Sequence, residues 1–313
     1  MLTWSEFLKQ DAEAWKTKAA ADSKSKYDVA KLHYNVEDDF IVDAFQTETI
    51  ATSTHVSNTK PKSGLYINGA SNPASALNTR ILKHLESGVD SLVIHVDAAA
   101  DLSVLLSGIY PDMVEITLLT EGDKAILKSG VQQYLVSLSP EKLSDMHIAV
   151  EKPFRLSAGH KFSERLRAFY GRMCQLDTNE TLILITELKQ DFIAQIAELR
   201  AIRLVWNQSG RSANDLKIIS TATGEDNNGV HPMIVANYQL MSAVLGGVNI
   251  VAPIMGDDDE SVRLMLNMMH IFREESRLDF VHDPLAGAYV PEALTVQMVR
   301  YCNNPENISS IEM

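Results

Sequence analysis

The sequence predicts an α/β protein: a (β/α)8 barrel of the TIM type with an N-terminal helical arm. Three observations predict it. From Gly64 onward, short β-rich runs alternate with helical patterns, the runs number eight, and a chain of 313 residues can bury one large core and carry appendages. Strands and helices in alternation pair in parallel through right-handed crossovers, and eight such strands close a barrel.

Residues 1–60 are predicted to form an arm or linker. The stretch from Ser5 to Lys18 has helical spacing, with Trp4, Phe7, Leu8 and Trp15 on one side and Ser5 as a candidate N-cap. The following run to Lys26 has almost nothing to bury, and residues 47–63 are typical of exposed coil. A short helix with two Trp and a Phe is expected to lie on its own barrel or on a neighbouring chain.

The barrel is assigned to residues 61–281, and residues 282–313 to a C-terminal tail. The eight predicted strands are 64–68, 91–96, 114–119, 134–138, 147–150, 181–186, 216–220 and 248–252. The fourth run, 134–138, has an alternative as the end of a helix. The clearest predicted helices are 73–85, 162–174, 192–206, 233–245 and 260–271.

Composition excludes several classes of function. The chain has 28 Lys and Arg against 41 Asp and Glu, a formal net charge of −13, so a nucleic-acid partner is not expected. Two cysteines cannot build a disulfide framework and fit the reducing cytoplasm. No stretch has the 18 apolar residues of a membrane span, and the N-terminus has no secretory signal pattern, so a cytoplasmic protein without membrane contact is expected.

Small polar residues lie in several predicted strands, whereas barrel interiors are usually packed with bulky branched side chains. A polar lining would suit a channel that admits a polar ligand, so these residues are substrate-channel candidates. The alternative is that they lie at strand ends or face the helices. The candidates are Asn68, Thr117, Ser137, Thr186, Ser220 and Thr221.

The usual chemical motifs are absent from the sequence. It has no phosphate-binding glycine loop, no nucleophile elbow and no HxxxH pair, so no catalytic, cofactor-binding or metal-binding residue is assigned. His95 and Asp97 end a predicted strand, although Asp97 is better interpreted as a cap for a helix from Leu102. The acidic run 257–260 is better interpreted as the N-terminus of a helix than as a cation site. The polar loop 221–229 is the best candidate for a functional loop.

Several segments, in order and at matching spacing, resemble the methylmalonyl-CoA mutase family. Residues 196–206 (IAELRAIRLVW) resemble its Ile-Ala-x-Leu-Arg-Ala-x-Arg-x-Leu-Trp helix, and residues 237–247 resemble the helix and Gly-Gly turn before its last barrel strand. Glu274-Glu-Ser276 and residues 282–292 (HDPLAGAYVPE) resemble its Glu-Glu-Ser and Asp-Pro-x-Gly-Gly-Ser-Tyr-x-Val-Glu signature. Ser157-Ala-Gly159 resembles its Asn/Glu-Ala-Gly element. Together the matches cover about residues 64–298.

This resemblance implies a barrel whose axis is threaded by the pantetheine of an acyl-CoA. It also implies adenosylcobalamin chemistry, in which methylmalonyl-CoA rearranges to succinyl-CoA. Catalytic members carry a cobalamin-binding domain with an Asp-x-His-x-x-Gly motif, and 145–150 departs from that motif because Val150 replaces the glycine. They also carry a His-x-Gln-Thr-Ser-Gly-Trp on strand seven, which 216–224 lacks, and a Tyr-His where this chain has Pro153-Phe154.

A barrel that keeps the helices and loses the reactive groups resembles the small subunit of heterodimeric methylmalonyl-CoA mutase. This implies a non-catalytic, structural chain that pairs with a large catalytic subunit, binds no cobalamin itself, and relies on adenosylcobalamin held by that partner. The chain is shorter than expected for such a subunit. The alternative is an independent TIM-barrel acyl-CoA-binding protein or enzyme that uses the loops at the carboxyl ends of the strands. The sequence leaves open which acyl-CoA is used and whether the chain alone forms a homodimer.

Overall fold

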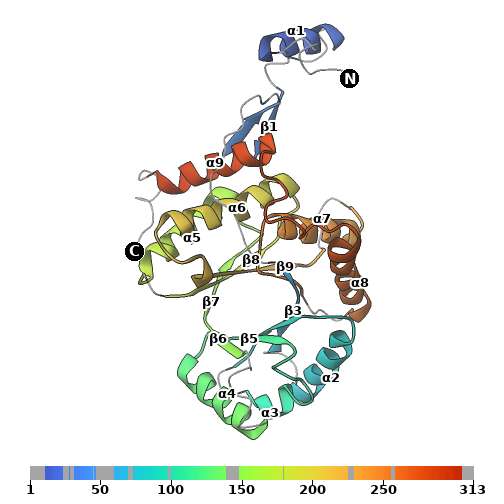
Figure 1. The fold of residues 1–313 in the computed structure, drawn as a ribbon, viewed down its shortest axis with the longest axis vertical. Coiled ribbons are helices and arrows are strands. Elements are labelled where there is room, and N and C mark those ends of the chain that lie inside the picture. Colours follow the sequence, from blue (N-terminus) through green and yellow to red (C-terminus); the bar gives the residue numbers. More distant parts are fainter. Residues whose placement is uncertain are drawn as a thin grey trace.

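The computed structural model describes residues 11–23, 28, 32–44, 46, 60–69, 73–97, 100–138, 148–178, 180–224, 229–254 and 258–304. Eight parallel strands curl into a nearly closed barrel with helices around it (Figure 1). The predicted α/β barrel is therefore confirmed. Among the described residues, no helix combines the length and apolar character that a membrane span requires.

The barrel strands follow one another around the ring in the order β6-β5-β4-β3-β10-β9-β8-β7. The pairing of β3 with β10 joins the first and last barrel strands of the chain. The strands are β3 (Lys62–Asn68), β4 (Ser91–His95), β5 (Glu115–Leu119), β6 (Ile148–Glu151), β7 (Pro153–Leu156), β8 (Leu182–Glu187), β9 (Leu216–Ala222) and β10 (Ile250–Pro253).

All five of the clearest predicted helices are confirmed, with ends within two residues of the expectation. The helices around the barrel are α2 (Ala74–Leu85), α3 (Leu102–Leu105), α4 (Lys124–Leu138), α5 (Phe162–Gln175), α6 (Phe192–Gln208), α7 (Pro232–Leu245) and α8 (Asp259–His270). A 3-10 turn, η5 (Ala213–Asp215), precedes β9, and a π-turn, η6 (Ile271–Glu275), extends α8. Helix α9 (Tyr289–Asn303), within the predicted tail, packs on α6.

The predicted strand 134–138 is wrong, because these residues end helix α4. Leu127, Val131 and Tyr134 are buried at helical spacing, whereas Val136 is exposed, so the β-branched and aromatic character of this run belongs to an amphipathic helix. The eighth strand is instead β7, which follows β6 after the single residue Lys152. No crossover helix separates the two: β6 pairs with β5, and β7 pairs with β8.

The arm contains a helix and an unexpected hairpin. Helix α1 (Ala12–Asp22) is capped by Asp11 and has no buried residue, and it lies away from the barrel (Figure 1). The N-terminal part of the predicted helix, with Trp4, Phe7 and Leu8, lies outside the described residues. Strands β1 (His33–Val36) and β2 (Phe40–Asp43) form an antiparallel hairpin.

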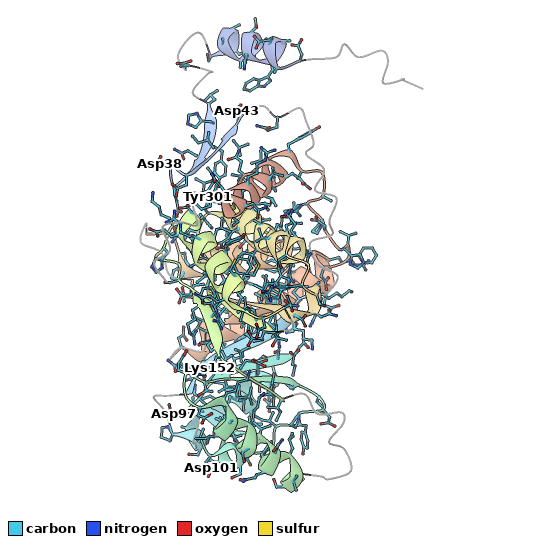
Figure 2. The ribbon with its side chains drawn as sticks, turned by 90° about the vertical axis from the view of Figure 1, so that its left-hand side faces the viewer. Asp38, Asp43, Asp97, Asp101, Lys152 and Tyr301 are labelled. Atoms are coloured by element: carbon cyan, nitrogen blue, oxygen red, sulfur yellow. The ribbon has the colours of Figure 1, made fainter. Side chains whose placement is uncertain are left out.

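The hairpin is fixed to the helices of its own chain. Phe40 is buried and meets the ring of Tyr301 of α9 edge-on at 5.6 Å. Figure 2 shows Tyr301 next to the end of the hairpin that carries Asp38. The Glu37 carboxylate accepts a hydrogen bond of 2.7 Å from the backbone N–H of Phe162, at the first turn of α5. The hairpin is therefore held by its own domain, whereas the docking of the Trp-bearing helix on this barrel or on a neighbour stays a prediction.

Within the described ranges, buried apolar side chains form three clusters. One lies between the strands and α5, α6, α7 and α9, and a second lies between the strands and α2, α3 and α4. The third lies inside the ring and is built from β3, β4, β5, β8, β9 and β10. The interior cluster decides what the barrel axis can hold.

Candidate functional site

Apolar side chains line the middle of the barrel's inner face. Because side chains alternate across a strand, every second residue of each strand faces the axis. The residues of the interior cluster are Tyr66, Val93, Leu119, Ile183, Ile185, Ile219, Ile250 and Ala252, and all are buried. A Cβ added at Gly64, on the same face, would collide with Ile250. The inner faces of the neighbouring strands β3 and β10 are therefore in close contact at this position.

At the amino-terminal end of the barrel, an ion pair crosses the axis. Lys217 of β9 pairs with Glu115 of β5, and these two strands lie opposite one another in the ring. The Lys217 ammonium also donates to the Thr117 hydroxyl at 3.0 Å, and Lys62 of β3 lies 2.6 Å from the Glu115 carboxylate. Burial favours a raised pKa for Glu115, but the two lysines outweigh it and hold the pKa of this carboxyl below its usual value.

At the carboxyl-terminal end, a second contact crosses the axis. The guanidinium of Arg155, on β7, lies 5.7 Å from the ring centroid of Tyr66, on the opposite strand β3. His95 lies beside this pair, 3.9 Å from the Glu121 carboxylate. Burial, followed by the charge of Arg155, lowers the pKa of His95. Side chains thus meet across the axis at both ends, with the apolar cluster between them.

The six predicted channel residues divide between three places. Asn68, Thr117 and Thr221 share the inner face with the interior cluster, whereas Thr186 and Ser220 alternate to the outer face, beneath the helices. Ser137 lies on helix α4 and not on a strand. Their role as a substrate channel stays a prediction, which three of the six positions do not favour.

The bonding of these hydroxyls also differs. Thr117 accepts from Lys217, and Thr186 accepts from the buried Arg165, so both have structural partners. Asn68 also has a partner. The hydroxyls of Ser220 and Thr221 are buried, and among the described residues they have no hydrogen-bond partner.

The other candidates occupy structural positions. Asp97 is exposed, and the cap of α3 is Asp101, whose carboxylate accepts from the N–H groups of Ser103 and Val104, so the expected Asp97 cap is wrong. Asp258 caps α8 as expected for the acidic run. Within loop 221–229, residues 225–228 lie outside the described part of the chain.

Asp259, in the same acidic run, joins α8 to α2. Its carboxylate lies 2.5 Å from Arg80 and 2.9 Å from Lys83, and His84 lies 3.3 Å away. Hydrogen bonds from Lys83 and Arg80 hold the pKa of Asp259 far below its usual value. This cluster fastens the helices on either side of the β3–β10 closure, and it is saturated by its own cations.

The segments that carry the family resemblance meet in buried ion pairs around α6. Arg200 is fully buried, with Asp283 on one side and Glu292 at 3.1 Å on the other. Arg203 donates to the carbonyl oxygen of Gly247 and to the Asn249 side chain, both at 2.6 Å. These contacts join the 196–206 helix to the 282–292 signature and to the Gly-Gly turn.

A similar pair holds the Ser157-Ala-Gly159 element. Arg165 and Glu198 form a buried ion pair of 2.7 Å, and Arg165 also donates to the carbonyl oxygen of Ser157 at 3.2 Å. Glu187 accepts from the Ser157 hydroxyl and from the Ala158 N–H, each at 3.0 Å. Sequence reasoning missed these pairs, although Arg and Glu on an otherwise apolar helix were a signal for them.

Comparison with known proteins supports the same relationship. Residues 167–312 match the family model described as methylmalonyl-CoA mutase. The chain is similar to methylmalonyl-CoA mutases. It is 30% identical over 164 residues to the methylmalonyl-CoA mutase of Escherichia coli (strain K12), which covers 46% of this chain and 21% of that protein. It is 28% identical over 124 residues to that of Cereibacter sphaeroides, which covers 34% of this chain and 18% of that protein.

The matched part thus spans about a fifth of the length of these curated relatives. The family-model match, residues 167–312, contains Arg200, Arg203 and their partners. Among solved structures, the dihydropteroate synthase of Xanthomonas albilineans is 12% identical with a TM-score of 0.39, over 68% of this chain and 92% of that one. At these values the likeness carries no argument about function.

Proposed function

We propose that this chain is the non-catalytic subunit of an adenosylcobalamin-dependent acyl-CoA mutase of the methylmalonyl-CoA type, and that it pairs with a catalytic chain that holds the cofactor. The observation that carries the proposal is the occupied barrel axis. Contacts between opposite strands, Lys217 to Glu115 and Arg155 to Tyr66, lie at its two ends, and apolar side chains fill the space between them.

In a barrel of this family, the acyl group is expected to reach the carboxyl ends of the strands along the axis. We infer that a pantetheine chain has no path here, because side chains of opposite strands meet at both ends of the axis and an apolar cluster lies between them. The residues present therefore do not fit a threaded acyl-CoA next to a corrinoid. We derive no catalytic step through the cofactor in this chain.

The helices around the barrel, on which a partner could dock, are held together by buried ion pairs. The buried pairs of Arg165 and Arg200 keep the helices in place at a high desolvation cost, and such pairs favour one defined arrangement. A scaffold chain needs this rigidity and does not need reactive groups. The fold and the sequence similarity therefore both suit a subunit that stabilises a catalytic chain.

Reconstitution tests the proposal. The purified chain is assayed with adenosylcobalamin and either methylmalonyl-CoA or isobutyryl-CoA, first alone and then co-expressed with a catalytic mutase chain. We expect no turnover and no change in the cobalamin absorbance spectrum with the chain alone, together with a 1:1 complex that turns over when both chains are present. Turnover by the isolated chain would contradict the proposal and favour the independent barrel enzyme.

A further inference from the structure

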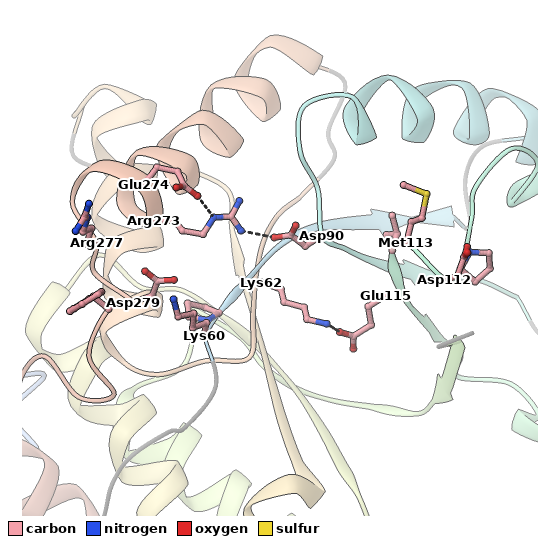
Figure 3. A pocket seen from close by; sticks show the side chains of 14 residues that line it. Lys60, Lys62, Asp90, Asp112, Met113, Glu115, Arg273, Glu274, Arg277 and Asp279 are labelled. Atoms are coloured by element: carbon pink, nitrogen blue, oxygen red, sulfur yellow. Dashed lines mark hydrogen bonds and ion pairs between the residues drawn. The ribbon is translucent and has the colours of Figure 1, made fainter. Parts of the chain in front are cut away.

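The face at the amino ends of the strands carries a groove that lies outside the occupied axis. Its volume is about 700 Å³, and residues from the start of β3, the turn before β5 and the segment after η6 line it (Figure 3). The Lys62–Glu115 pair lies between its two sides, together with Arg273, which lies 2.8 Å from Asp90. The charges at the centre of the groove are therefore already paired.

Two tight turns hold large apolar side chains out into water on opposite sides of this groove. In the turn Tyr110–Met113, the Met113 N–H donates to the carbonyl oxygen of Tyr110 at 3.0 Å, and the Met113 side chain is 77% exposed. On the other side, the Phe280 N–H donates to the carbonyl oxygen of Arg277 at 3.1 Å, and the Phe280 side chain is 72% exposed. Ordered turns that present such side chains mark an interaction surface.

The two sides also carry opposite charges. Asp112 stands next to Met113, whereas Lys60, Arg277 and Asp279 lie on the other side of the groove and together carry one net positive charge (Figure 3). Within the described part of the chain, Asp112, Lys60 and Arg277 have no ion-pair partner. Arg277 has a φ of 51°, in the left-handed region that residues other than glycine seldom adopt. This backbone conformation sets the direction in which the Arg277 side chain leaves the chain.

We propose that this groove is the contact surface for a second copy of the chain, related by a two-fold axis. The Met113 side of one copy packs on the Phe280 side of the other, and Asp112 of each copy faces Arg277 of its partner. A two-fold interface requires such a self-complementary surface, with each residue pair occurring twice. Here one side supplies the Asp112 carboxylate and the other the Arg277 guanidinium, neither of which has an ion-pair partner in the described ranges.

A second copy fits better than a small molecule, because the apolar side chains stand on the edges of the groove. A small ligand between the two sides would leave both in water, whereas a protein surface covers them. The overall charge of −13 makes two copies of the chain repel one another in general. The groove lining has four basic and five acidic residues, which is nearly neutral, so repulsion here is small.

A charge exchange tests the pairing in the full chain. Sedimentation velocity is recorded from about 5 to 200 µM for the wild type, Asp112→Arg, Arg277→Asp and the double variant. We expect a wild-type dimer, a dissociation constant at least about tenfold higher in each single variant, and recovery of the dimer in the double variant. Asp is a suitable replacement at residue 277 because it tolerates a positive φ better than most residues.

Apolar substitutions supply the matched control. Phe280→Glu should abolish the dimer, whereas Ile234→Glu, at a similarly exposed apolar side chain on α7, should leave it intact. Circular dichroism melting confirms that each variant is folded. A wild type that stays monomeric up to 200 µM, a dimer that no groove variant weakens, or a double variant that fails to recover would each overturn the proposal. The test uses this chain alone, so its outcome is independent of the proposed mutase role.

Discussion

Removal of the Arg200 charge tests whether the shared mutase segments hold the fold. Arg200 on α6 is fully buried between Asp283 and Glu292, and the α9 helix that carries Glu292 packs on α6. In Arg200→Met the two carboxylates would stay buried without their cation. The N–H groups of Leu285 and Gly287 donate to Asp283 and Glu292, each at 3.2 Å, and these long hydrogen bonds do not replace the guanidinium charge.

Breaking a buried ion pair by removal of one partner costs about 3–5 kcal/mol. With a urea slope of about 3 kcal/mol per molar, this shifts the unfolding midpoint by about 1–1.7 M. The measurement is urea unfolding followed by circular dichroism at pH 7. Arg200→Lys should lie between the wild type and Arg200→Met, because an ammonium keeps one ion pair but loses the two-sided guanidinium contact.

The matched control is Arg263→Met, which removes an exposed pair with Glu260 within α8 and should leave the midpoint unchanged. If Arg200→Met unfolds at the wild-type midpoint, the buried pairs do not anchor the C-terminal segment. The interpretation that the mutase-like segments stabilise the fold would then be wrong.

Three further substitutions test the arm, the packed axis and a buried histidine by the same unfolding assay. Phe40→Ala should cost about 3–5 kcal/mol because the ring is buried against α9, whereas Ile41→Ala, on the exposed face of the hairpin, should cost much less. Gly64→Ala should cost about 1–3 kcal/mol by overpacking the axis, whereas Gly130→Ala, where a Cβ makes only an ordinary contact, should not destabilise. Burial lowers the pKa of His84, so the folded state binds its proton less readily and the free energy of unfolding should fall as the pH drops below about 6.5. His84→Gln should remove that part of the fall.

Each of these expectations has a clear contrary result. Equal losses at positions 40 and 41 would mean that the hairpin is not held by its inner face. A neutral Gly64→Ala would mean that the axis has spare volume. If His84→Gln loses as much free energy of unfolding between pH 7.5 and pH 5 as the wild type does, other groups cause the pH dependence.

The sequence predicts most of the barrel because its periodic patterns are local. Helix 162–174 buries residues at helical spacing, and strand 181–186 is a continuous apolar run, so both are recognised without tertiary information. The run 134–138 fails because β-branched and aromatic residues also suit the buried side of a helix. Strand β7 is missed because it starts with a proline, contains an arginine and follows β6 without a loop.

The contacts between side chains of opposite strands could not be predicted from the sequence. Lys217 and Glu115 are 102 residues apart, and they meet only because the ring places β5 opposite β9. In the same way, the strand alternation that turns Thr186 outward and Thr221 inward depends on register. A polar residue in a strand thus indicates a channel only when the face it occupies is known.

The most direct test of the occupied axis is binding of an acyl-CoA by the isolated chain. Methylmalonyl-CoA is titrated into the protein at pH 7 and 25 °C by calorimetry. Because side chains of opposite strands already meet across the axis, we expect no saturable binding heat at ligand concentrations up to about 1 mM. This limit corresponds to a binding free energy weaker than about −4 kcal/mol. A 1:1 isotherm with a micromolar dissociation constant would contradict this expectation.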